Sequence, residues 1–170
     1  MTQTAQKEKF VKLINNNKGI LYKIISIYCK DLEDRKDLEQ EILIQLWKSM
    51  PFYNDQYKVS TWIYRIALNV SISFYRKGIK IKKTNTSLTE SIFQITEDEG
   101  HAEELSKKSL QLQKFIDQLD DFNKAIIILY LEDKSYKEIA EIIGISETNV
   151  GTKLNRIKAK LKEYFSLVNN

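Results

Sequence analysis

Apolar residues recur along the chain at steps of three and four positions, the spacing of one face of an α-helix. Leu38, Ile42 and Leu46 are a clear example. A single proline and five glycines leave these segments long and uninterrupted. We therefore expect an all-α protein, with helices at about 4–16, 19–30, 34–50, 60–77, 105–118, 122–132, 136–143 and 147–165.

Residues 79–104 interrupt this periodicity. They mix Ser, Thr and Asn with acidic residues, and the stretch 88–104 carries six acidic residues without a Lys or Arg. This composition is typical of a solvated, flexible linker, and its negative charge would repel DNA. The sequence thus predicts two small helical domains, at 1–78 and 105–170, joined by an acidic linker at 79–104.

Positive charge is concentrated in two short stretches, although the net charge of the whole chain is only +4. Residues 76–83 hold five Lys or Arg and no acid, and residues 147–163 hold five against two Glu. Basic surfaces of this kind permit nucleic-acid binding without requiring it. The sequence motifs are therefore needed to decide whether this chain binds nucleic acid.

A helix-turn-helix is predicted by the stretch EIAEIIGISETNVGTKLNRIK at 138–158. Ser135 and Glu138 have the spacing of a capping box at the start of its first helix. Gly144 can take the left-handed conformation of the turn, and Ser146 can cap the second helix. In such a motif the second helix enters the major groove of DNA. Its outward positions hold side chains that can bond base edges or phosphates, namely Thr148, Asn149, Thr152, Lys153, Asn155, Arg156 and, further along, Lys160. From the motif alone, an ordinary helical hairpin with a solvated lysine face stays open.

Gly151 lies inside this second helix, where glycine costs about 1 kcal/mol relative to alanine. Two explanations stay open. The missing side chain could let the helix sit deeper in the groove, or the glycine could be a tolerated weak point without a role.

Two longer patterns narrow the function. The strings DLEQEILIQLW at 37–47 and STWIYRIALN at 60–69 resemble the region-two signature of bacterial sigma factors of the extracytoplasmic-function (ECF) type. The string QLDDFNKAIIILYLEDKSYKEIAEIIGIS at 118–146 resembles region four of the same family. The resemblance keeps the family's order around a variable linker. Where the family usually has a proline and a Lys or Arg, this chain has Asp120 and Gly151.

The resemblance implies that the chain binds promoter DNA and core RNA polymerase. The polymerase would be bound through its flap and its clamp helices, and the clamp helices would meet Asp37, Leu38, Gln40 and Glu41. The first domain would melt the minus-ten element and hold its nontemplate strand with Tyr53, Asn54, Tyr57, Arg65, Asn69, Arg76 and Lys77. A base drawn out of a duplex needs polar edges and a stacking surface, which these loop residues and Phe52 offer. The second helix of the helix-turn-helix would read the minus-35 element. An anti-sigma factor is a further partner that the family suggests.

Other functional classes fit less well. His101 stands alone in the acidic linker and Cys29 lies in an apolar helix pattern, so neither has the neighbours that catalysis or metal binding requires. We expect no enzymatic activity, cofactor, metal or small-molecule substrate. The chain starts without the apolar run of a signal peptide and contains no stretch long enough to span a bilayer, so we expect it in the cytoplasm. The alternative is a conventional helix-turn-helix regulator, which would bind a palindromic site as a dimer.

Overall fold

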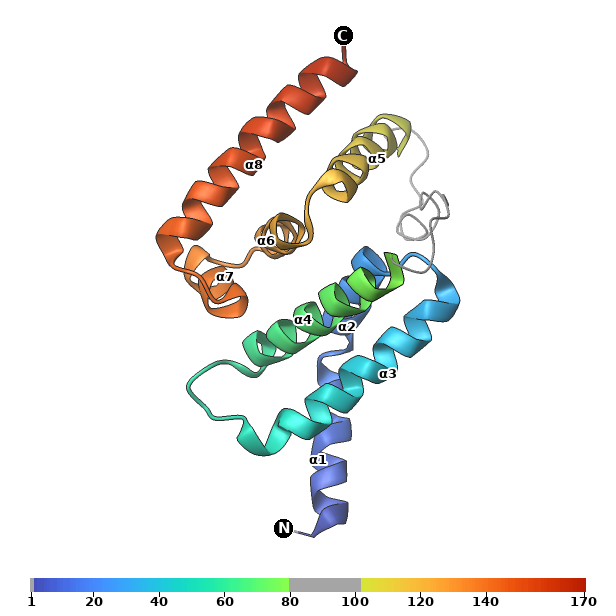
Figure 1. The fold of residues 1–170 in the computed structure, drawn as a ribbon, viewed down its shortest axis with the longest axis vertical. Helices are drawn as coiled ribbons and strands as arrows, with labels where there is room; N and C mark the ends of the chain where they lie inside the picture. The colour runs from blue at the N-terminus through green and yellow to red at the C-terminus, as the bar shows by residue number, and fades with distance from the viewer. Residues whose placement is uncertain (1, 80–101) are drawn as a thin grey trace. The chain divides into compact units, whose positions relative to one another are not determined.

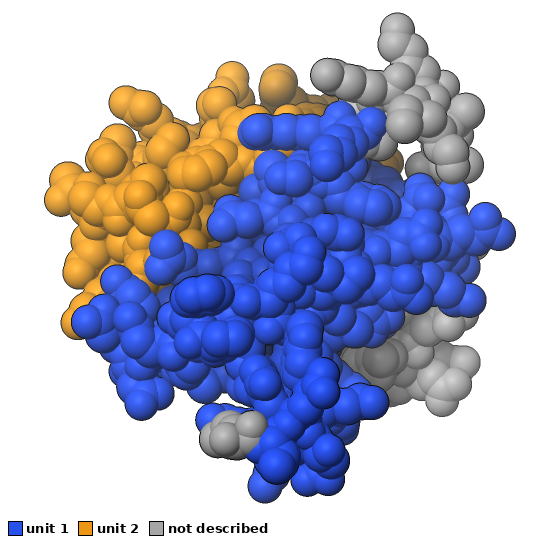
Figure 2. All heavy atoms as spheres, turned by 60° about the horizontal axis from the view of Figure 1, so that its bottom comes forward, with its two compact units in different colours: residues 1–88 blue, residues 89–170 orange. Residues whose placement is uncertain are grey.

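The computed structural model describes residues 2–79 and 102–170, which are helical over most of their length (Figure 1). The chain divides into two compact units, Met1–Leu88 and Thr89–Asn170, which Figure 2 distinguishes by colour. Helices extend into both ends of the predicted linker, because α4 ends at Ile79 and α5 begins at Ala102. The rest of that predicted linker, 80–101, lies outside the described residues.

The first unit contains the helices α1 (Gln3–Asn16), α2 (Lys18–Tyr28), α3 (Leu32–Ser49), the short 3-10 helix η1 (Met50–Phe52) and α4 (Val59–Ile79). Its core lies where α2, α3 and α4 pack together. The apolar stripe of α3 is fully buried there, and so are residues of its two neighbours, including Ile24, Leu38, Ile42, Leu46, Ile63 and Ala67. Helix α1 contributes no buried residue; its Phe10 ring meets the ring of Trp47 edge-on at 5.1 Å.

The second unit contains α5 (Ala102–Gln118), α6 (Asp121–Leu131), α7 (Tyr136–Ile143) and α8 (Glu147–Val168). Helices α6, α7 and α8 all contact one another. Residues at helical spacing on each of them fill the space between, among them Ala125, Ile126, Leu129, Ile139, Val150 and Leu154. The three helices therefore form one small core around the predicted helix-turn-helix.

Short local signals set the ends of α6, α7 and α8. Each helix begins at a residue whose side chain accepts a bond from a backbone N–H of the first turn: Asp120, Ser135 and Ser146. The predicted capping box is confirmed, since the N–H of Ser135 donates to Glu138 at 2.9 Å and that of Glu138 donates to the Ser135 hydroxyl at 3.1 Å. Gly144 ends α7 with φ +84°, the left-handed conformation that glycine adopts without steric cost.

The all-α prediction is confirmed: every predicted helix is present, with ends within one helical turn of the expected positions. Pro51 follows the end of α3 and lies in η1. Cys29, which lies in an apolar helix pattern, is buried, and its thiol is free of any disulfide.

Candidate nucleic-acid interface

Helix α8 has one buried stripe and one broad exposed face. Val150, Leu154 and Ile157 are buried and hold the helix against the rest of its unit. On the other side lie six of the seven residues predicted for DNA recognition, all exposed: Thr148, Asn149, Thr152, Asn155, Arg156 and Lys160. The Thr152 hydroxyl donates to the carbonyl of Thr148 at 3.0 Å, so its remaining capacity is as an acceptor. This face offers amide, hydroxyl and guanidinium groups on a rigid support, the chemistry that reads base edges and phosphates.

Lys153, the seventh predicted residue, is directed toward α6 instead. It is only half-exposed, and its Nζ lies 5.3 Å from the centre of the Phe122 ring. Its charge also acts on Asp120, at the start of that helix. Partial burial of Asp120 opposes ionisation, but hydrogen bonds from Asn123 and from the Phe122 N–H, together with Lys153, lower the pKa of the carboxyl below its usual value. Lys153 thus lies at the edge of the exposed face, beside α6, and its contact with DNA stays a prediction.

Lys158, on the same helix, makes a second contact of this kind. Its Nζ lies 4.3 Å from the centre of the Tyr130 ring, near the end of α6. Polar contact with the Tyr130 hydroxyl, aided by Tyr136, raises the pKa of Lys158. Thus two of the lysines that make this stretch basic are held by aromatic residues of the unit itself.

Gly151 faces Tyr136, the first residue of α7. A Cβ atom at position 151 would lie 3.5 Å from the edge of the tyrosine ring, an ordinary contact distance. Gly151 is also half-buried and not at the centre of the exposed face. The Tyr136 ring therefore leaves room for an alanine at position 151 and does not itself require glycine.

In the first unit, the loop between η1 and α4 is held by its own aromatic residues. The Tyr53 hydroxyl donates to the carbonyl of Tyr57 at 2.7 Å, and its ring lies 5.1 Å from that of Trp62. The guanidinium of Arg65 lies 5.7 Å from the centre of the Tyr57 ring. Tyr53 is therefore half-buried and its hydroxyl donor is occupied, whereas Asn54 and Tyr57 remain exposed. Phe52, just before the loop, is 84% exposed and is the most accessible large apolar side chain among the described residues.

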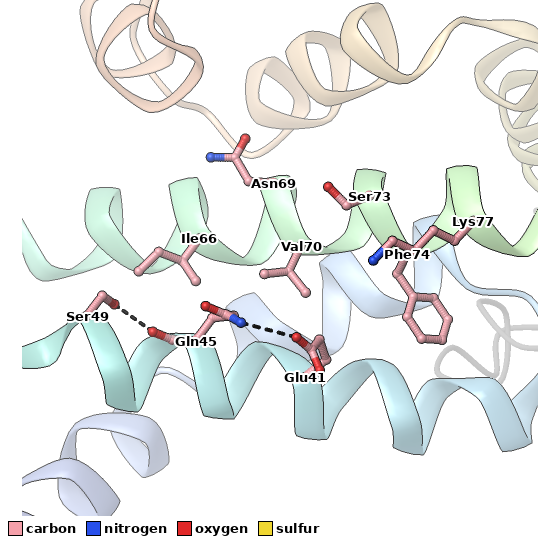
Figure 3. Close-up of a pocket in the computed structure, with 9 residues that line it drawn as sticks. All are labelled: Glu41, Gln45, Ser49, Ile66, Asn69, Val70, Ser73, Phe74 and Lys77. Atoms are coloured by element: carbon pink, nitrogen blue, oxygen red, sulfur yellow. Dashed lines mark hydrogen bonds between the residues drawn. The ribbon is translucent and has the colours of Figure 1, made fainter.

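Helix α4 carries the remaining residues predicted for the minus-ten element. They are exposed along one side of the helix: Arg65, Asn69, Arg76 and Lys77. Asn69 and Lys77 also line a pocket of about 440 Å³ between α3 and α4 (Figure 3). Ile66 and Val70 point toward α3 in this view, whereas Asn69 points away from it.

Three polar residues of α3 form the other wall of this pocket. Glu41, Gln45 and Ser49 follow one another at four-residue steps, and the Gln45 amide donates to the Glu41 carboxylate at 3.2 Å. The Ser49 hydroxyl donates to the carbonyl of Gln45 at 2.8 Å. Sequence reasoning did not identify Gln45 and Ser49 as part of a site, although their spacing beside the stripe of Leu38 could have placed them on one helix edge.

The residues predicted to meet the polymerase do not all lie at the surface. Asp37, Gln40 and Glu41 are exposed on α3, but Leu38 is 0% exposed and lies in the core. The expectation for Leu38 is corrected, because a side chain packed between helices cannot touch a partner without opening the unit. Leu38 instead belongs to the core that holds α3 and its exposed acidic residues in place.

The described residues contain no cluster of His, Cys, Asp and Glu side chains that could hold a metal ion. His101 lies outside the described residues. No helix in the described part of the chain has the length and apolarity needed to cross a membrane.

Comparison with known families adds the deciding observation. The family described as Sigma-70 region 2 matches residues 13–79, and the family described as Sigma-70, region 4 matches residues 109–161. The RNA polymerase sigma factor YlaC of Bacillus subtilis is 33% identical over 135 residues, covering 78% of each chain. The ECF sigma factor SigM of the same species is 28% identical over 148 residues, covering 86% of this chain and 88% of that protein. The chain belongs to the ECF sigma factors of RNA polymerase.

Two solved structures share the fold of this sigma factor. One is CnrH in complex with the cytosolic domain of CnrY, with a TM-score of 0.67, 17% identity and coverage of 95% of this chain and 90% of that one. The other is RpoE from Bartonella quintana in complex with the anti-sigma factor NepR, with a TM-score of 0.64, 17% identity and coverage of 94% and 96%.

As a sigma factor, this protein directs promoter-specific initiation of transcription. The alternative of a conventional regulator is not favoured, because both sigma regions match in one chain and in the family's order. Sigma factors as a class are initiation factors and not enzymes.

Proposed function

We propose that the exposed face of α8 lies in the major groove of the upstream promoter element. Asn149, Thr152 and Arg156 would contact base edges, and Lys160 would contact a phosphate. The observation that carries this proposal is the division of α8 into a buried apolar stripe and an exposed polar face. Side chains that point outward from a helix fixed in its domain are the groups available for reading an intact duplex.

We also propose that the loop at 53–58 and the adjacent face of α4 hold the melted nontemplate strand of the minus-ten element. Phe52 and Tyr57 offer exposed aromatic surface for stacking, and Asn54 and Asn69 offer amide groups for an unpaired base. Arg76 and Lys77 would contact phosphates, a contribution that is independent of sequence and weakens with salt. Tyr53 would stabilise the loop, because its hydroxyl already donates to Tyr57.

For core polymerase we propose the acidic outer edge of α3, with Asp37, Gln40 and Glu41 as its exposed residues. A negatively charged surface suits a protein partner better than DNA. The polymerase and its promoters are cytoplasmic, so we place this function in the cytoplasm. By analogy with the relative bound to an anti-sigma factor, a protein of that class is a candidate partner of this chain. The proposal assigns no catalytic group or cofactor to the protein.

Transcription in vitro with purified core polymerase tests the proposal. Initiation at specific promoters of a genomic library should depend on this protein, with one copy bound per polymerase. A dimer that protects a palindromic site without polymerase would contradict it.

Arg156→Ala tests the placement of α8 within that assay. We expect it to weaken recognition of the upstream element by about 1–3 kcal/mol while core binding is unchanged. Lys114→Ala is the matched control, since Lys114 is an exposed basic residue on α5, outside the proposed interface. Equal loss of DNA recognition and core binding in Arg156→Ala would argue against the assignment.

A further inference from the structure

Two lysines of α8 lie over aromatic rings at the two ends of α6. Lys153 Nζ is 5.3 Å from the centre of Phe122, in the first turn of α6, and Lys158 Nζ is 4.3 Å from the centre of Tyr130, near its end. A cation within about 6 Å of a ring centre is attracted by the negative face of the ring. Each lysine therefore has an electrostatic partner within its own unit.

The two lysines lie on opposite sides of the buried stripe of α8. At 100° per residue, position 153 falls on one flank of Val150 and Leu154, and position 158 falls on the other. Both side chains are half-exposed, between the buried stripe and the exposed face. The hydrophobic effect is non-directional, so it selects which face of α8 is buried more strongly than the exact rotation of the helix about its axis. A rotation in either direction would move one lysine away from its ring.

We propose that Lys153 and Lys158 are positioning residues that fix the rotation of α8 on α6, and that their charges are not used on DNA phosphates. Tyr136 of α7 lies beside the same helix, because a Cβ atom at position 151 would be 3.5 Å from its ring. The two lysine contacts determine which side chains of α8 point outward. This inference rests on the proposed role of α8 in the major groove and separates its basic residues into two groups with different tasks.

The salt dependence of binding distinguishes the two groups. Each phosphate contact contributes about 0.9 to the slope of log K against log salt concentration, because a bound counterion is released. Holoenzyme carrying Lys160→Met should lose about 0.9 from this slope. Holoenzyme carrying Lys153→Met or Lys158→Met should keep the wild-type slope and discriminate promoter from non-promoter DNA about three- to ten-fold less well. Methionine keeps most of the aliphatic stem, so packing is largely retained.

A pairwise test needs no DNA. Urea unfolding of the free protein, followed by circular dichroism, should show the same midpoint shift for Lys158→Met, for Tyr130→Leu and for the double variant. Lys158→Arg, which keeps a cation over the ring, should behave like the wild type. Additive shifts would mean that the two side chains do not act through each other and would overturn the inference.

Three results of the salt experiment are informative. A loss of about 0.9 in slope for Lys153→Met or Lys158→Met would mean that the residue contacts a phosphate and is not a positioning residue. Unchanged slope together with unchanged discrimination would remove the positioning role. If Lys160→Met leaves the slope unchanged and Arg156→Ala leaves recognition of the upstream element unchanged, the placement of α8 on DNA fails. The unfolding experiment still decides whether Lys158 and Tyr130 form a pair.

Discussion

The two units differ in how their helices are held. In the first, α3 and α4 have 18 and 21 residues, and a continuous apolar stripe on each packs into one core. In the second, α6 and α7 have only 11 and 8 residues, and each begins at a side-chain cap. Isolated helices this short are marginal in water, because nucleation is costly and few residues follow to offset it. Helix length alone does not decide this, because Asp31 caps α3 whereas the 11-residue α2 has no side-chain cap. In the second unit, however, the three consecutive helices α6, α7 and α8 all begin at one.

The two proposed DNA surfaces also differ. The first unit presents a loop with exposed aromatic side chains beside a helix edge, which suits bases that have left the duplex. The second presents a single face of a helix that is packed firmly in its unit, which suits the fixed pattern of groups in the major groove. A surface for a deformable single strand can be assembled from a loop, but one for an intact duplex has to keep its geometry.

The largest expected effect on stability comes from truncating a fully buried side chain in either core. Leu38→Ala should lower the free energy of unfolding of the first unit by about 2–5 kcal/mol, since Leu38 is fully buried. Leu154→Ala should cost the second unit a similar amount. Both tryptophans, Trp47 and Trp62, lie in the first unit, so tryptophan fluorescence in urea reports on that unit alone. If Leu154→Ala shifts the fluorescence transition as much as Leu38→Ala does, the units do not unfold independently.

A smaller effect is expected at the turn of the helix-turn-helix. Gly144→Ala should destabilise the second unit by about 1–2 kcal/mol, because φ is +84° and a Cβ atom is disfavoured in that conformation. Thermal unfolding followed by circular dichroism measures it. Gly19→Ala in α2 is the matched control in the first unit: a Cβ there meets no atom within 4 Å, so the change should be neutral or slightly stabilising. Equal losses for both variants would show that the turn imposes no special strain.

The cap of α6 should make the second unit sensitive to acid. Asp120→Ala should cost about 1 kcal/mol at neutral pH through loss of the bonds to the first-turn N–H groups. The pKa of Asp120 is lower in the folded state than in the unfolded state. Its stabilisation is therefore complete above the unfolded value of about 3.9 and is lost as pH falls through the folded value. The unfolding midpoints of the wild-type protein and of Asp120→Ala should converge as the pH falls from 7 to 2. A difference that stays constant would exclude a role of the Asp120 charge.

The smallest effect is expected at Gly151, and it has the opposite sign. Gly151→Ala should stabilise the second unit by about 0.5–1 kcal/mol, because the new methyl group makes an ordinary contact with Tyr136 and alanine favours the helix. Promoter affinity should be unchanged. A gain in stability with a several-fold loss of affinity would instead support a helix that needs glycine to sit deep in the groove. Gly151→Leu, which must displace the tyrosine ring, provides a destabilised comparison.

Features that depend on a few neighbouring residues could be predicted from the sequence. The helices, the capping box of Ser135 and Glu138, and the turn at Gly144 all follow from local spacing. The burial of Leu38 could have been predicted as well, since it begins the stripe continued by Ile42 and Leu46. The family motif implies a polymerase contact for Leu38, but the apolar periodicity already indicated that its side chain is buried.

Contacts between elements could not be predicted in this way. The orientation of Lys153 depends on where α6 places Phe122, and the role of Tyr53 depends on a hydrogen bond that closes a loop. The pocket beside Asn69 exists because α3 and α4 pack side by side. Helical spacing gives the face of each residue but not the neighbour that the face meets.

The buried position of Cys29 makes this protein convenient for distance measurements. It is the only cysteine of the chain, and burial raises the pKa of its thiol, so it reacts slowly with alkylating dyes. A cysteine introduced on the exposed face of α4 and another on that of α8 can therefore carry a donor and an acceptor fluorophore without removal of the native thiol. Energy transfer between them would report the separation of the two units, free and on polymerase.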